Sequence, residues 1–298
     1  PSDRIISQFT WHLEHDRGFS KWTIVRYAYC VRLFLEFHFG KKPIQLQSLQ
    51  SSDLQAAVVN DQRRFGSSHA KSHAIGLRCF LRWLYLRGII RTDLTGSIPS
   101  IANWKLQRIP TIISAQEVKR LLRSCDRQSQ MGRRNYAIIL LLARLGLRAG
   151  EIVALRLEDI EWHCGMLHIS GKGNIRRRLP IPPDVGAALA SYLRYARPRC
   201  DDRHVFLCMN APHRSLGHSS TVSSIVALAL RRADMKPARR GAHLLRHTLA
   251  SSLLNRRTPL MEIGQLLGHR SSQATEIYAK VDIKNLREVA QRWVGGEA

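Results

Sequence analysis

A stretch without hydrophobic periodicity, over residues 95–110, divides the 298-residue chain into two parts. It opens with the sequence Thr-Gly-Ser-Ile-Pro-Ser, whose glycine and proline interrupt regular elements, as is typical of linkers between domains. Each part is long enough to bury a hydrophobic core of its own. The sequence therefore predicts two domains, over residues 1–97 and 112–298, joined by a linker over residues 98–111.

The first part predicts a bundle of helices, because its apolar residues recur every three or four positions. A first helix is expected around residues 5–13 and a second around residues 22–37, with Ser20 as its N-cap. Two more are expected over about 52–65 and 67–86. We expect the aromatic residues of these helices to form the core of the bundle rather than to stack on bases. The apolar stripes are Ile5, Ile6, Phe9 and Leu13 in the first helix, and Trp22, Val25, Tyr29, Leu33 and Phe37 in the second.

The second part predicts a mixed α/β domain in which helices dominate. It opens with a capping box, in which Ser114 precedes Glu117 by three residues. Two short strands, over about 166–170 and 178–182, flank a glycine-rich hairpin turn. Helices are predicted over about 135–145, 149–155, 183–196, 219–233, 244–255, 260–267 and 283–293.

The charge of the chain indicates a polyanionic partner. Lys and Arg number 47 and Asp and Glu 22, so the net charge is +25. Neutralising phosphates releases counterions and favours binding, which makes nucleic acid the leading interpretation. A ribosome-like structural protein or a basic secreted protein is the alternative. Because the basic residues are spread along the chain, we expect them to line a folded groove rather than a disordered arm.

Other classes of protein find little support. The six cysteines form no C-x-x-C pair, which favours reduced thiols in a cytosolic protein over a zinc ribbon or a disulfide framework. No signal peptide or membrane-spanning run occurs, since the apolar run from Ala137 ends at Arg144. The chain begins at Pro1, so whether residues precede it stays open. We expect no further DNA-binding domain before residue 1, and therefore short, simple core sites.

Five short motifs place cationic, imidazole and phenolic side chains in a fixed order. Each alone occurs by chance, but five in order with these separations are a strong signal. Cutting a DNA strand by transesterification needs a nucleophile, groups that stabilise charge on the phosphate and a proton for the departing oxygen. The motifs are Gly146-Leu-Arg148-Ala-Gly-Glu151, Gly171-Lys172-Gly173, His243-Leu-Leu-Arg246-His247, Leu267-Gly268-His269 and Tyr278.

In order, spacing and local sequence these motifs resemble those of the tyrosine recombinases, or phage-type integrases. The likeness covers most of the chain and is closest to compact Xer-like members and to those encoded by integrons or transposons. It implies a fold that is mainly α with a small β-sheet: an N-terminal helical core-binding (SAM-like) domain and a mixed α/β catalytic domain. It also implies a cytoplasmic, nucleoid-associated prokaryotic protein.

The resemblance further implies site-specific strand exchange on double-stranded DNA. Four protomers would hold two duplexes, cut them through a 3′-phosphotyrosine and resolve a Holliday junction, without metal, nucleotide or other cofactor. Integration, excision or transposition of a mobile element is the expected role. The alternatives are Xer-type dimer resolution, DNA relaxation by a type IB topoisomerase-like enzyme, and a DNA-binding regulator whose catalytic fold is inactive.

The resemblance assigns a role to each motif residue. Tyr278 is the nucleophile, Arg148 and Arg246 grip non-bridging oxygens of the phosphate, and Lys172 protonates the departing oxygen. The predicted helix after Tyr278 docks on a neighbouring protomer.

The remaining motif residues have supporting roles. His243 and His269 hydrogen-bond the phosphate, Glu151 supports Arg148 without touching DNA, and His247 packs inside the domain. His243 and His247 also have the i,i+4 spacing of a helical zinc site, but Leu244 stands where a zinc protease has glutamate, and no further ligands lie nearby. We therefore expect no metal site.

Overall fold

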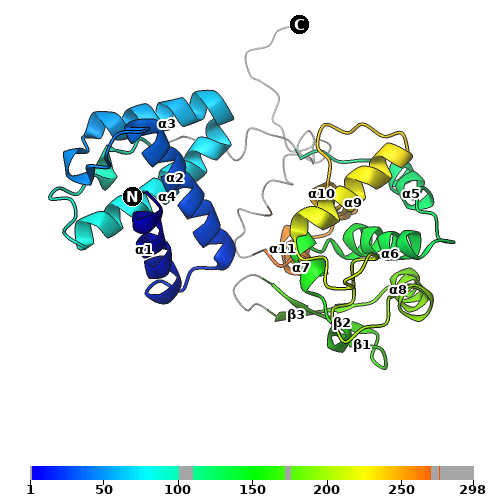
Figure 1. The fold of residues 1–298 in the computed structure, drawn as a ribbon. Coiled ribbons are helices and arrows are strands. Elements are labelled where there is room, and N and C mark those ends of the chain that lie inside the picture. The colour runs from blue at the N-terminus through cyan, green and yellow to red at the C-terminus, as the bar shows by residue number, and fades with distance from the viewer. Residues whose placement is uncertain (1, 101–109, 172–175, 270–274, 276–298) are drawn as a thin grey trace, which may run out of the picture. The chain divides into compact units, whose positions relative to one another are not determined.

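The computed structural model describes residues 2–100, 110–171, 176–269 and 275. The chain divides into two compact units, Pro1–Lys105 and Leu106–Ala298, which Figure 1 shows as a helical unit and a mixed unit. The predicted linker lies mostly outside the described residues, so its bounds remain a prediction. The fold class that the sequence predicted, helical in the first unit and mainly helical with a small sheet in the second, is confirmed.

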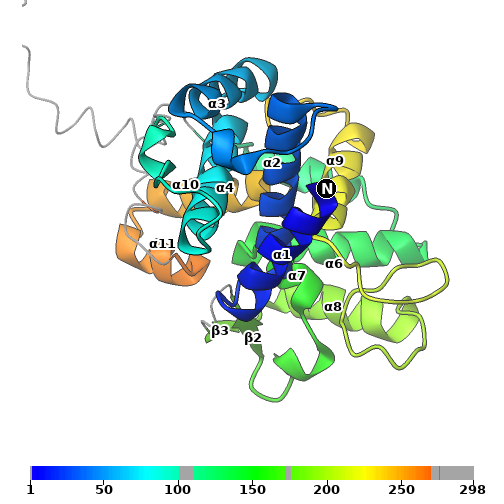
Figure 2. The same ribbon diagram turned by 60° about the vertical axis from the view of Figure 1, so that its left-hand side comes forward.

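Unit 1 is a bundle of four helices around an aromatic core. Helix α2 packs on α1, α3 and α4, and α3 packs on α4, as Figure 2 illustrates. Phe9 and Phe80 are fully buried, and their rings meet edge to face with centroids 5.2 Å apart. The helices are α1 Ser2–His15, α2 Lys21–Phe39, α3 Ser51–Phe65 and α4 Ser67–Leu86, with short 3₁₀ turns at η1 Leu46–Ser48 and η2 Thr95–Ser97.

The expectation that the apolar stripe of α2 lies in the core was wrong. Trp22 is 66% exposed and Val25 60% exposed, and Tyr29 and Phe37 are exposed as well. A neighbouring stripe on the same helix is buried instead. Both stripes have helical spacing, and periodicity alone does not say which of two apolar faces meets the other helices. The buried residues of α2 are Ile24, Tyr27, Cys30, Val31, Phe34, Leu35 and Phe39.

Unit 2 is built around helix α6, which packs against α8 and α10 (Figure 1). Its small antiparallel sheet has the order β1-β2-β3, with Leu167 of β2 paired to Leu179 of β3. The predicted capping box is present, since Ser114 Oγ accepts from the Glu117 backbone N–H at 3.2 Å. The helices are α5 Ala115–Arg123, α6 Gln130–Leu145, α7 Ala149–Ala154, α8 Pro183–Tyr195, α9 Ser219–Arg232, α10 Ala242–Asn255 and α11 Leu260–Leu267, with a 3₁₀ turn at η3 Leu157–Asp159.

The strands differ in part from those expected. Strand β2 spans Met166–Ser170 as predicted, whereas β3 spans Arg176–Pro180 and so begins two residues before the predicted start. The two-residue strand β1, Ile160–Glu161, was not predicted, because two residues carry no alternation to detect. The predicted hairpin turn between β2 and β3 carries the motif lysine, Lys172, which lies outside the described residues.

The C-terminal end of α6 brings distant segments together. Helix α6 ends at Gly146, whose left-handed φ of 60° suits a residue without a side chain. A Cβ atom at Gly146 would lie 2.5 Å from a methyl group of Leu267, so α11 can approach only because this position is glycine. Arg148 follows two residues later, beside the end of α11. Thus a turn 120 residues away in sequence lies at the start of α7.

Two further observations bear on the class of protein. Within the described ranges, no helix is both long and apolar enough to cross a membrane. All six cysteines are free thiols, of which Cys30 and Cys125 are buried. The predicted helix over 283–293 lies outside the described residues.

Candidate active site

The last turn of α11 binds three arginines that come from three different elements. Backbone carbonyls 266, 267 and 268 follow one another at this helix end. Arg177 of β3 donates to the first, Arg246 of α10 to the second at 2.7 Å, and Arg148 to the third at 2.8 Å. Carbonyls at a helix C-terminus lack intrahelical partners and carry partial negative charge, so cations are stabilised there. The helix end therefore holds three guanidinium groups close together.

Glu151 links two of these arginines. Its carboxylate is buried, with 4% of the side chain exposed. One oxygen accepts from Arg148 Nη1 at 2.9 Å, and the other accepts from the Arg148 backbone N–H at 2.8 Å and from Arg177 Nη2 at 2.7 Å. Three guanidinium groups and one carboxylate leave an excess of positive charge. Such a cluster suits a bound anion that supplies the missing negative charge.

Arg246 is the most buried of the three arginines, with 4% of the residue exposed. Besides the α11 carbonyl, it donates to the Gly146 carbonyl at 2.5 Å. It therefore joins the end of α6 to the end of α11. Two carbonyl groups therefore fix the orientation of the guanidinium. A group that binds a phosphate oxygen in a transition state needs such a fixed orientation.

Two histidines of the motifs lie near the arginines. His243 lies in the first turn of α10, where desolvation by the surrounding protein, together with Arg246 and Arg148, lowers its pKa. His269 follows α11, and its Nδ1 lies 2.7 Å from the hydroxyl of Thr275. Burial and the three arginines lower the pKa of His269 to about 4. At neutral pH His269 is thus a neutral hydrogen-bonding group and not a cation.

His247 was expected to pack inside the domain, and it is half-buried one helical turn after His243. The two rings have centroids 6.2 Å apart. Both line a cavity of about 290 Å³, together with Thr111, Arg239 and Arg240. Burial, His243 and nearby arginines lower the pKa of His247 to about 4. The cavity therefore continues the cationic surface beyond the motif residues.

Two motif residues, Lys172 and Tyr278, lie outside the described residues, so their roles remain predictions. In sequence, Lys172 stands between β2 and β3, and Tyr278 comes three residues after Thr275. Among the residues that are described, no group of three His, Cys, Asp or Glu side chains has a geometry that could hold a metal ion.

Sequence reasoning did not select Arg177 as a site residue. A signal for it exists, since Arg177 and the buried Leu179 are two residues apart on β3 and side chains of a strand alternate between faces. That alternation puts Arg177 on the inner face, whereas its neighbours Arg176 and Arg178 are exposed. Its 11% exposed side chain fits this position.

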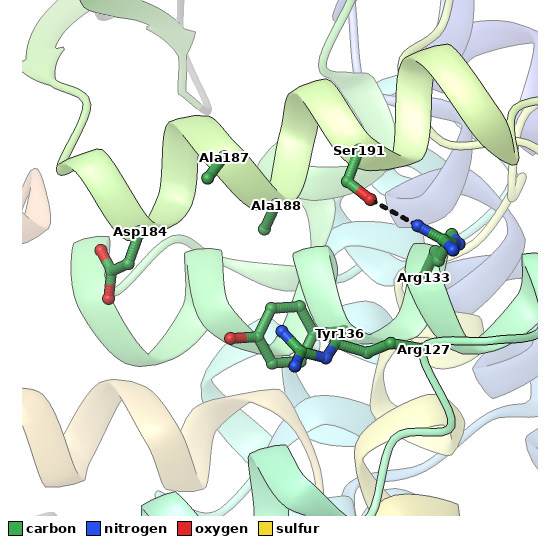
Figure 3. Close-up of a pocket in the computed structure, with 7 residues that line it drawn as sticks. All are labelled: Arg127, Arg133, Tyr136, Asp184, Ala187, Ala188 and Ser191. Carbon is green, nitrogen blue, oxygen red and sulfur yellow. Dashed lines mark hydrogen bonds between the residues drawn. The ribbon is translucent and has the colours of Figure 1, made fainter.

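A second cavity of about 290 Å³ lies between α6 and α8. Figure 3 shows Arg127 beside the ring of Tyr136, with its guanidinium carbon 5.0 Å from the ring centroid, and Arg133 donating to Ser191 at 2.9 Å. The cavity contains no histidine and none of the motif residues. The cluster at the end of α11 is therefore the candidate active site.

Guanidinium groups held rigidly beside neutral imidazoles suit the class of proteins that bind phosphodiesters. Comparison with known families is consistent with that class. The N-terminal SAM-like domain of phage integrases matches residues 6–88, and the phage integrase family matches residues 111–285. The chain belongs to the phage integrase family, the tyrosine recombinases, which are DNA breaking and rejoining enzymes.

Individual relatives agree with this assignment. The protein y4rA of Sinorhizobium fredii (strain NBRC 101917 / NGR234), named as an integrase/recombinase, is 43% identical over 97% of this chain and 71% of its own length. A crystal structure of the XerH site-specific recombinase bound to a palindromic difH substrate has a TM-score of 0.76 at 21% identity, covering 97% of this chain and 84% of that one. A lambda integrase tetramer bound to a Holliday junction has a TM-score of 0.70 at 16% identity, covering 99% and 80%. These structures share the fold.

Proposed function

We propose that this chain is a site-specific recombinase that cuts and rejoins two DNA duplexes through a 3′-phosphotyrosine and a Holliday junction. The observation that carries the proposal is the cluster in which Arg148 and Arg246 meet at the end of α11 with an excess of positive charge. A phosphodiester that is being attacked gains negative charge on its non-bridging oxygens. The cluster offers fixed cations at one place for that charge.

Arg148 and Arg246 bind the non-bridging oxygens of the scissile phosphate. A guanidinium has five N–H donors. Arg148 uses Nη1 for Glu151 and Nη2 for the Gly268 carbonyl, which orients the group and leaves further donors for phosphate. Glu151 holds Arg148 in place from its buried side and does not contact DNA.

Tyr278 attacks the phosphorus atom, and the 5′ oxygen of the departing strand leaves. That oxygen needs a proton, which Lys172 supplies. His243 and His269 donate hydrogen bonds to the phosphate, and His243 assists removal of the phenolic proton. The ester between Tyr278 and the DNA conserves the energy of the bond, so that the strand is rejoined without a nucleotide or metal cofactor.

The partner is double-stranded DNA at specific core sites. The net charge of +25 and the cationic cavity beside His243 support electrostatic binding to the phosphate backbone. Four protomers act on two duplexes, by analogy with the lambda integrase tetramer on a Holliday junction. The predicted helix over 283–293 docks on a neighbouring protomer, which makes cutting depend on assembly.

The biological role that we propose is integration, excision or transposition of a mobile element, by a protein that works in the cytoplasm on the nucleoid. The high identity to a protein named as an integrase/recombinase supports it. Xer-type dimer resolution is the second candidate, favoured by the similarity in fold to XerH. A topoisomerase-like enzyme would relax a supercoiled plasmid that carries no specific site, whereas the recombinase requires paired sites.

The chemistry is tested with Tyr278→Phe and a DNA substrate nicked close to the scissile phosphate, so that cleavage releases a short strand and traps the adduct. The wild-type protein is expected to form a denaturant-resistant adduct. The variant is expected to bind the same DNA and form none, because only the phenolic oxygen attacks while affinity comes from phosphate contacts. Adduct formation by Tyr278→Phe would show that another residue is the nucleophile.

A further inference from the structure

We propose that Arg177 is a positioning residue: it fixes both groups that orient Arg148, the Glu151 carboxylate and the end of α11, and so aims Arg148 at the scissile phosphate. The proposal deepens the proposed function and rests on it. Arg177 belongs to none of the five sequence motifs and lies 29 residues after Arg148. Its role follows from contacts that only the folded structure brings together.

The first observation is that Arg177 and Arg148 share their partners. Arg177 Nη2 lies 2.7 Å from the Glu151 oxygen that also accepts the Arg148 backbone N–H. Arg177 Nη1 donates to the Leu266 carbonyl, two residues before the carbonyl that Arg148 binds. Each anchor of Arg148 is thus held a second time by Arg177. If Arg177 is removed, both anchors are free to shift.

The second observation is the close packing around Arg177. Its side chain is 11% exposed and that of Glu151 is 4% exposed, so neither can exchange its partner for bulk water. A Cβ atom at Gly268 would come within 3.0 Å of the Arg177 guanidinium. Gly268 also has a left-handed φ of 63°. The helix end therefore turns at a glycine, and the guanidinium lies against that turn.

The consequence for the reaction is geometric. Displacement of a catalytic group by about 1 Å can cost about 10²-fold in rate. Arg148 has 36% of its side chain exposed and relies on its two anchors for its orientation. Loss of Arg177 is expected to slow cleavage while the affinity for uncut DNA, which many phosphate contacts share, changes little.

The test compares Arg177→Met with Arg178→Met. Both variants lose one cation from β3, but Arg178 is exposed and pairs with Glu161 at 3.0 Å, away from the cluster. Cleavage of the nicked substrate, single-site affinity and thermal unfolding are measured on the full chain. We expect Arg177→Met to cleave about 10–100-fold more slowly, within the cost of a small displacement, and Arg178→Met to cleave at the wild-type rate. Arg177→Lys keeps the charge but lacks the planar fork whose two nitrogens reach Glu151 and the Leu266 carbonyl separately, so its rate is expected to lie between those of wild type and Arg177→Met.

A second substrate separates positioning from a merely structural role. A methylphosphonate at the scissile position replaces one charged oxygen by a methyl group and removes the need for the Arg148 charge. On this substrate the wild-type and Arg177→Met rates are expected to converge. An unchanged ratio between the two rates, or a wild-type rate for Arg177→Met on ordinary DNA, would overturn the proposal.

Failure of the variant to fold and failure of the wild-type protein to react have different meanings. If Arg177→Met fails to fold, the same comparison is made with Arg177→Lys, and a wild-type rate for that variant overturns the proposal. If the wild-type protein forms no adduct on either substrate, the proposed function itself fails, which the wild-type lane alone reveals.

Discussion

Both units bury a carboxylate against a cation, but they balance the charge differently. In unit 1, Asp61 Oδ2 lies 2.6 Å from His73 Nδ1, and His73 is 2% exposed. The pair is surrounded by rings, with Tyr29 and His69 at centroid distances of 6.1 and 4.3 Å from His73. In unit 2, Glu151 lies between Arg148 and Arg177. One acid therefore pairs with one base in the first unit, whereas in the second one acid pairs with two arginines and a third arginine binds the same helix end.

The histidines respond in opposite directions. Burial opposes the charge of His73, but its hydrogen bonds to Asp61 and Cys30 outweigh burial and raise its pKa to about 9. Burial and the unbalanced arginines instead lower the pKa of His269 to about 4. An ion pair whose charges balance needs no further partner, whereas a cluster with excess positive charge favours the binding of an anion such as a phosphate. This difference separates a structural cluster from a candidate active site without reference to motifs.

The largest effect expected concerns the proton that the departing oxygen needs. With pKa values of about 4, His247 and His269 are neutral at pH 7 and are poor sources of that proton. We therefore expect Lys172 to be the donor and Lys172→Ala to slow cleavage by about 10²–10⁴-fold, the usual contribution of a general acid. Cleavage of the nicked substrate gives the rate.

Sulfur in place of the bridging oxygen supplies the control, because a thiolate leaves without protonation. The sulfur substrate is expected to restore most of the rate of Lys172→Ala and little of the rate of Arg148→Met. If it fails to favour Lys172→Ala, that lysine only binds DNA, and a histidine must be the acid despite its low pKa.

The next effect tests the balanced pair in unit 1. Removing one partner of a buried ion pair costs about 3–5 kcal/mol, and since His73 can lose its proton we expect Asp61→Asn to cost about 3 kcal/mol. Urea unfolding measures the loss, and cleavage by the folded variant should match wild type. Asp3→Asn is the matched control, because Asp3 pairs with Arg32 at 81% exposure and should cause no measurable change. Equal effects of the two changes would show that Asp61 contributes no more than a surface charge.

The fold was predictable where local signals dominate. The predicted third and fourth helices agree with α3 and α4 to within one residue at each end, and the Ser114–Glu117 capping box is present. The buried face of α2 was not predictable, because that helix carries apolar side chains on two faces and only tertiary contacts choose between them. Propensity and periodicity describe a helix but not the element it packs against.

For the site, the sequence supplied the motif residues but not their connections. The order of the motifs predicted Arg148, Glu151 and Arg246 as site residues. It could not show that Arg148 binds a carbonyl 120 positions away or that Glu151 is shared with Arg177, 26 positions away. Contacts at such separations depend on how α11 and β3 approach α7, which local patterns do not encode.

The smallest effect, and the most direct test of the comparison, is an opposite dependence of stability on pH in the two units. For His73 the folded pKa of about 9 exceeds the unfolded value of 6.5, so the folded state retains a proton that the unfolded chain loses. Its stabilising contribution is complete below pH 6.5 and is lost as the pH rises towards 9. At pH 8 about 2 kcal/mol of it is gone.

For His269 and His247 the sign is reversed. Their folded pKa of about 4 lies below 6.5, so the unfolded chain binds protons that the folded unit does not. Unit 2 is therefore expected to be fully stable above pH 6.5 with respect to these groups and to lose stability as the pH falls from 6.5 towards 4. The titratable groups that face His73 all belong to unit 1, so their titration does not change the stability of unit 2. They are Asp61, Cys30, His69 and Tyr29.

Two buried thiols allow the units to be followed separately in the intact chain. Cys30 is buried in unit 1 and Cys125 in unit 2. At each pH, urea titration followed by brief labelling with a disulfide reagent that reacts with thiols in acid as well as in base gives two midpoints, read from the labelled peptides by mass spectrometry. From pH 6 to pH 8 the Cys30 midpoint is expected to fall while the Cys125 midpoint holds or rises. His73→Gln should abolish the fall at Cys30 alone, since it removes the imidazole whose proton is held by the hydrogen bond to Asp61. If both midpoints move in the same direction and His73→Gln changes neither, the charge balance of the two clusters does not govern their stability, and the contrast between a structural pair and an anion-binding cluster has to be abandoned.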